Sequence, residues 1–192
     1  MTSTSARAVL LTIAVAAGRL APGRAQATPA SWLDNAKPAG WNEPGLAVPP
    51  APRIDAPEPR CSAQARPPEL DEDTALGVRG WELVGPYQAG WQTIVIRATA
   101  AYDGMCRPRQ YQDFVFVRGV FAGTLSPQAM DSRTDGAIGR VFLQSGSRIM
   151  AEYQRYTAAD PLCCPSGSAS VQFEITGTPP VVRPLSATRS AR

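Results

Sequence analysis

Two adjacent cysteines lie in the segment DPLCCPSG, residues 160–167, which is rich in loop-forming residues. Such thiols can act as a redox pair, bind a soft metal or form structural disulfides. In an exported protein, four cysteines normally form disulfides. Because adjacent cysteines rarely bond each other, we expect Cys61 and Cys106 each to pair with one of Cys163 and Cys164. A thiol redox or metal protein is the alternative.

Other catalytic chemistry is restricted because the chain contains no histidine. This excludes Ser-His-Asp, Cys-His and histidine–metal sites. Carboxylates remain, and a glycosidase needs two of them at a set separation. The available acids are Asp103, Asp113, Asp131, Asp135, Glu152 and Asp160. We predict a protein that is not an enzyme and has no cofactor or metal, with a carboxylate-based hydrolase as the alternative.

Charged side chains gather in three loop segments, CRPRQY (106–111), MDSRTDG (130–136) and the residues before the adjacent cysteines. Arginine recognises carboxylates and phosphates through its planar fork, so these segments predict a polar binding patch. A disulfide from Cys106 to the adjacent pair would bring the first and third segments together. The alternative is a capped turn and a salt-bridged structural corner. The candidate residues are Arg107, Arg109, Asp131, Arg133, Asp135, Arg155 and Asp160.

The N-terminus has the pattern of a secretory signal. A charged start precedes the apolar run AVLLTIAVAAG, residues 8–18, and AQA at 25–27 offers a cleavage site after Ala27. The run is too short for a stable membrane anchor, and no cysteine follows the site to carry a lipid. Removing residues 1–27 takes three of the 19 basic residues and leaves 16 against 16 acidic ones. We therefore expect a periplasmic or secreted protein without a transmembrane anchor, and no nucleic-acid partner.

Composition divides the remaining chain into three parts. Residues 28–60 contain eight prolines and predict a disordered, extended linker. Trp32 and Trp41 within it leave open that this part docks on the domain or on a partner. Residues 61–185 are expected to form a single globular domain, and residues 186–192 a flexible tail.

Within the domain, the pattern predicts one helix followed by strands. Acids at its start, Arg79 near its end and Gly80 after it favour a helix over 69–79. Strands are predicted from WELVG, WQTIVIRATA, QDFVFVRG, VFAGTL, SRIMAEYQRY and SVQFEIT. In QDFVFVRG both faces are apolar, which indicates a central strand that is covered on both sides. The expected class is α+β and strand-rich, with a short N-terminal helix packed on a mostly antiparallel, disulfide-stapled sheet of five to seven strands.

Three of these segments resemble a known family. GW-x-LVGPY, FVFVRGVFAGT and DPLCCPSG followed by SVQFEI are similar to the LppP/LprE family of exported bacterial lipoproteins, over residues 61–185. The CCPSG element is the most specific part. The resemblance implies a small, disulfide-bearing envelope domain and carries no catalytic residues over, since the family has no assigned activity. The chain departs from the family in lacking a lipid-bearing cysteine after the signal.

These observations favour a non-enzymatic domain that binds an envelope protein or a small ligand. Export, the expected disulfides and the Trp-bearing Pro-rich segment support a binding or interaction role. The absence of a histidine-based catalytic set points the same way.

Overall fold

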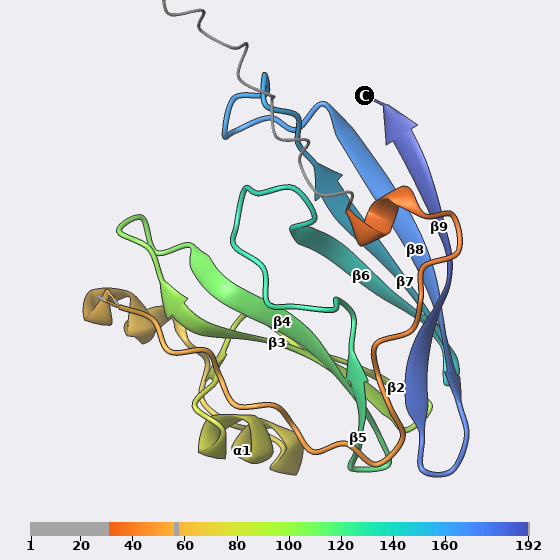
Figure 1. Cartoon of the computed structure of the whole chain (residues 1–192). Helices are drawn as coiled ribbons and strands as arrows, with labels where there is room; N and C mark the ends of the chain where they lie inside the picture. Colours follow the sequence, from red (N-terminus) through yellow and green to blue (C-terminus); the bar gives the residue numbers. More distant parts are fainter. Residues whose placement is uncertain (1–30, 56–57, 192) are drawn as a thin grey trace, which may run out of the picture.

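Residues 31–55 and 58–191 are described by a computed structural model, shown in Figure 1. The predicted signal peptide, residues 1–27, lies outside the described residues. The elements are, in chain order, η1 (Trp32–Asp34), η2 (Pro59–Gln64), α1 (Asp71–Val78), β1 (Glu82–Leu83), β2 (Gln88–Gly90), β3 (Thr93–Tyr102), β4 (Pro108–Val117), β5 (Val120–Thr124), β6 (Ile138–Ser145), β7 (Arg148–Arg155), β8 (Gly167–Thr176) and β9 (Val181–Ala191).

The strands form two antiparallel sheets. In the first sheet the order is β1-β3-β4-β5, with β2 also paired to β3; in the second it is β6-β7-β8-β9. Figure 1 shows the two sheets facing each other, with α1 on the far side of the first sheet. The strand-rich α+β class with antiparallel pairing is confirmed. The strand count differs, because the described residues form nine strands in two sheets and not a single sheet of five to seven.

Both faces of the first sheet are covered, as the sequence of β4 indicated. Val115 is buried between the sheets, in a core that we call the inter-sheet core. Phe114 and Phe116 are buried on the opposite face, against Leu76 of α1 and Trp81, in what we call the outer core. A strand that is apolar on both faces therefore becomes the central layer of the fold.

The second sheet buries one face only. Ile149, Ala151 and Tyr153 of β7 point into the inter-sheet core, and the predicted alternation of β8 is confirmed, since Val171 and Phe173 are fully buried. The hydroxyl of Tyr153 donates a hydrogen bond to the carbonyl of Leu125. Burial raises the pKa of Tyr153 well above its usual value.

Helix α1 lies within the predicted range, and its acids serve its N-terminal end. The carboxylate of Asp73 accepts hydrogen bonds from the backbone amides of Glu69 and Leu70, at 2.9 and 3.1 Å. It also pairs with Arg66, with Nη1 2.7 Å from Oδ2. Burial alone would raise the pKa of Asp73, but these donors outweigh it and the pKa is lowered.

Residues 31–55 run along the domain as a strap and add to its cores, which differs from the predicted extended linker. Leu33 is 1% exposed in the inter-sheet core, and Val48 lies in the outer core. Trp32 packs edge-on against Tyr153, with ring centroids 5.1 Å apart. The indole nitrogen of Trp41 donates to the carbonyl of Thr124 at 3.1 Å. The two tryptophans therefore dock on the domain, which is the alternative that the sequence left open.

The C-terminal residues also depart from expectation. Strand β9 extends through the predicted flexible tail to Ala191 and pairs with β8 along its length, with Ser190 opposite Ser168. Pro184 stands opposite Phe173, beside a register shift. Such an irregularity accommodates a residue that lacks a backbone donor. Hydrogen bonding to a neighbouring strand, rather than an apolar pattern, holds this segment in the sheet.

Candidate functional site

The predicted polar patch assembles in part, around Arg155 at the end of β7. Its Nε lies 2.8 Å from Oδ1 of Asp135, and its Nη2 lies 2.8 Å from Oδ1 of Asp34. Asp34 also pairs with Arg189 of β9. Two arginines and two carboxylates thus form one network that joins the strap, the loop before β6 and the second sheet.

The aspartates of the loop before β6 hold it against neighbouring segments by accepting hydrogen bonds from backbone amides. Oδ1 of Asp131 accepts a hydrogen bond from the backbone amide of Gln110 at 2.9 Å. Oδ1 of Asp135 accepts from the backbone amide of Tyr156 at 2.8 Å. Arg133 adopts a positive φ of 62° and makes no ion pair with a described residue. Asp135 is therefore paired by Arg155 and not by its sequence neighbour.

Arg107 and Arg109 do not join the Arg155 network. Arg107 pairs with Asp103, with Nε 2.6 Å from Oδ2, and Arg109 lies in β4 without an ion pair to a described residue. Asp160 closes its own loop, because Oδ2 accepts from the amides of Thr157 and Ser166 at 2.7 and 3.0 Å.

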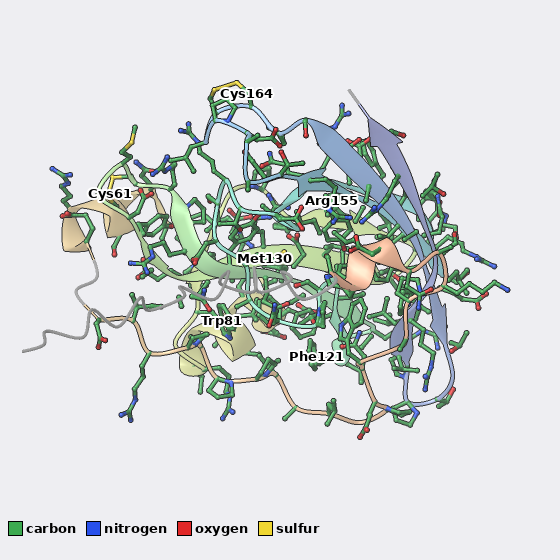
Figure 2. The ribbon with its side chains drawn as sticks, turned by 45° about the horizontal axis from the view of Figure 1, so that its top comes forward. Cys61, Trp81, Phe121, Met130, Arg155 and Cys164 are labelled. Atoms are coloured by element: carbon green, nitrogen blue, oxygen red, sulfur yellow. A yellow bond between two sulfur atoms is a disulfide. The ribbon has the colours of Figure 1, made fainter. Side chains whose placement is uncertain are left out.

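The reason for this separation is the disulfide pairing, where our expectation was wrong. Cys61 bonds Cys106, with Cα atoms 5.1 Å apart, and Cys163 bonds Cys164. Helix η2 packs against the turn after β3, where Arg60 donates to the carbonyl of Gly104 at 2.7 Å, and this places Cys61 beside that turn. The adjacent cysteines lie elsewhere, as Figure 2 shows, and have only each other.

Two hollows flank the network. The first, which we call the Arg155 hollow, has a volume of about 430 Å³. Its polar lining consists of two guanidinium groups and several hydroxyl groups, namely those of Arg155, Arg189, Tyr156, Thr157, Ser166, Ser168 and Ser190. The Arg155 side chain is only 16% exposed. Its Nη1 is buried and has no hydrogen-bond partner within residues 31–55 and 58–191.

The second hollow, of about 520 Å³, lies between the strap and the loop before β6. Trp32, Met130, Asp131 and Asp135 line it; Figure 2 labels Met130 and Arg155. A two-acid hydrolase needs two carboxylates in one cleft, and Asp131 and Asp135 both line this hollow. Both oxygens of Asp135, however, accept hydrogen bonds from Arg155, which leaves this acid committed to a cation.

Two residues of the network, Asp34 and Arg189, were missed by the sequence analysis. They lie in segments interpreted as a linker and a tail, and no local signal marks them. Among the described residues, no group of three acids or cysteines stands close enough to hold a metal ion.

These features define a small, two-sheet, disulfide-bonded domain with polar hollows at its surface. Residues 88–178 match the model of the LppP/LprE lipoprotein family, which confirms the resemblance over that segment. The match includes the FVFVRGVFAGT and CCPSG elements. It begins after the GW-x-LVGPY segment, which the family model does not cover. The match to a lipoprotein family is consistent with an exported, envelope-associated protein.

No curated protein and no solved structure matches the chain significantly. In the part of the chain that the structure describes, every helix is too short or too polar to cross a bilayer.

Proposed function

We propose that the protein is an exported, non-enzymatic binding domain of the cell envelope that holds a small anion in the Arg155 hollow. The observation that carries this proposal is a hollow lined by two guanidinium groups, those of Arg155 and Arg189, together with hydroxyl groups. Guanidinium groups recognise carboxylate and phosphate oxygens through charge-assisted hydrogen bonds.

The network fixes the guanidinium group before a ligand arrives. Asp135 holds Nε and Nη2 of Arg155, and Asp34 accepts from the same Nη2. A planar fork that is held on two sides loses little side-chain entropy on binding. The hydroxyl groups of Ser168 and Ser190 in the lining can donate to the remaining oxygens of the anion.

A binding role is favoured over a hydrolase or a thiol protein, because the carboxylates and cysteines that those roles need are already engaged in other interactions. Asp34 and Asp135 are engaged with arginines, Asp160 accepts hydrogen bonds from Thr157 and Ser166, and all four cysteines are in disulfides. A thiol redox or metal role would need Cys163 and Cys164 as free thiols. A hydrolase would need an acid that is free to exchange a proton with a substrate.

The test is a titration of the ¹⁵N-labelled exported protein with inorganic phosphate and, separately, with acetate, at constant ionic strength. We expect the amide signals of Thr157 and Ser166 to shift with saturation. Arg189→Gln removes one charged donor and should weaken binding about tenfold, from a loss of about 1.4 kcal/mol.

Arg148→Gln is the matched control, since Arg148 pairs with Glu174 outside the hollow; it should leave the titration unchanged. Absence of saturable shifts, or an equal affinity in Arg189→Gln, would overturn the proposal.

A further inference from the structure

A third hollow, at the opposite end of β7 from Arg155, is formed where hairpin turns of both sheets meet. It has a volume of about 720 Å³ and takes residues from the β2–β3, β4–β5, β6–β7 and β8–β9 turns. We call it the hairpin hollow. Seven residue steps of about 3.3 Å separate the two ends of β7, or about 23 Å. The hairpin hollow is therefore distinct from the Arg155 hollow.

The turns around this hollow are tied to one another, so the site is formed without a ligand. The hydroxyl of Thr93 donates to the carbonyl of Gly146 at 2.9 Å, across the two sheets. Arg118 donates through its backbone amide to the carbonyl of Gln92, and through Nε to Oε1 of the same residue, at 2.8 and 2.7 Å. A preformed hollow of this size falls in the range of small-molecule sites.

The lining is largely apolar, with one cation and the two threonines Thr176 and Thr178. Its large apolar side chains are those of Trp91, Val117, Val120, Ile175, Pro179 and Pro180. Trp91 is 65% exposed and Val120 is 44% exposed. Arg118 is the charged lining residue, and no described carboxylate forms an ion pair with it. An exposed tryptophan beside an unneutralised guanidinium group is a surface suited to an apolar anion.

The backbone that presents these groups is strained. Trp91, Gln92 and Arg118 have φ values of 50°, 66° and 51°, where glycine or asparagine is usual in a hairpin turn. Each such residue costs on the order of 1 kcal/mol. Residues in this region cluster at ligand sites, because the surrounding structure must enforce them. The strained conformation does not serve to bury an apolar side chain, because the Trp91 ring remains exposed.

We infer that the hairpin hollow binds a small molecule with a ring-sized apolar body and one carboxylate. The apolar body contacts Trp91 and Val120, and the carboxylate accepts hydrogen bonds from Arg118. The apolar lining argues for an apolar body over a strongly hydroxylated one. The lone guanidinium group supplies the charge complementarity. This site is independent of the anion site at Arg155, because the two hollows lie at opposite ends of β7.

The experiment compares two probes that differ only in charge, naphthalene-2-acetate and naphthalene-2-acetamide. Each is titrated into the ¹⁵N-labelled exported protein, and the indole N–H of Trp91 and the amide of Gly146 are followed. We expect the acetate to bind about tenfold more tightly than the amide, because one charged hydrogen bond contributes about 1.5–3 kcal/mol.

Two variants and a control locate the effect. Arg118→Gln should remove the difference between the probes, and Trp91→Ala should weaken both. Arg140→Gln, which breaks an exposed pair with Glu152 elsewhere on the surface, should change neither. The inference is overturned if the probes bind equally well to the unaltered protein, if neither binds at about 5 mM, or if the shifts fall on Thr157 and Ser166 of the Arg155 hollow instead.

Discussion

Asn42 of the strap bridges the edges of the two sheets, and its removal should be costly. Its Nδ2 donates to the carbonyls of Thr124 in β5 and Val182 in β9, at 2.9 and 3.0 Å. Its Oδ1 accepts from the amide of Thr124 at 2.9 Å. Gly123 makes room for it, since a Cβ there would stand 2.2 Å from the Asn42 side chain. The side-chain amide of Asn42 therefore links two strands that belong to different sheets.

The magnitude follows from the groups that Asn42→Ala would leave behind. Three hydrogen bonds are lost, at about 1 kcal/mol each. The Thr124 carbonyl keeps a donor in the indole of Trp41, whereas the Thr124 amide loses its side-chain acceptor. Asn42 is only 6% exposed, so water reaches these groups poorly. We expect the free energy of unfolding to fall by about 3 kcal/mol, a large part of the 5–15 kcal/mol typical of a domain.

Urea unfolding followed by tryptophan fluorescence measures this change. Asn35→Ala is the matched control, because Asn35 is exposed and its Oδ1 accepts one local bond, from the amide of Lys37. The control should stay within about 0.5 kcal/mol of the unaltered protein. If Asn42→Ala also stays within that margin, the strap does not clamp the sheets and the reasoning is refuted.

Two further predictions concern the cysteines and pH. A non-reducing tryptic digest should join the peptides that carry Cys61 and Cys106, while the adjacent cysteines remain in one peptide that is two hydrogens lighter than its reduced form; a link between the two regions would contradict this pairing. The backbone amide of Thr157, followed by that of Ser166, lowers the pKa of Asp160 to about 2 from its ordinary 3.8. The loop contacts should thus be fully present above about pH 4 and be lost as the pH falls through about 2, so a midpoint near 3.8 in the NMR titration of these amides would count against them.

Much of the fold was predictable where a pattern is local. The alternation of β8 and the double-sided apolarity of β4 gave both the strands and their faces, because side chains in a strand alternate with period two. The helix start followed from acids at its positive end, and Asp73 accepts the free amides there. These features depend on neighbours within a few residues.

Three strands, β2, β6 and β9, were missed, and the two longer ones, β6 and β9, have weak patterns. In β6 the register shifts twice against β7, which breaks the alternation that a sequence window can detect. In β9, a proline and a run of small and polar residues resemble a tail. Both strands are held by hydrogen bonds to β7 and β8, and those partners cannot be seen from the segments themselves.

The sequence alone determined the restricted chemistry, the family resemblance and the local strand patterns, since these depend on residue types and short spacings. The tertiary structure decided which cysteines pair and which charges meet. Arg155 donates a hydrogen bond to Asp34, 121 residues away in the sequence, and Asn42 donates one to Val182, 140 residues away. Such contacts arise because the two sheets and the strap pack around the inter-sheet core, and no single segment of the sequence determines the geometry of that packing.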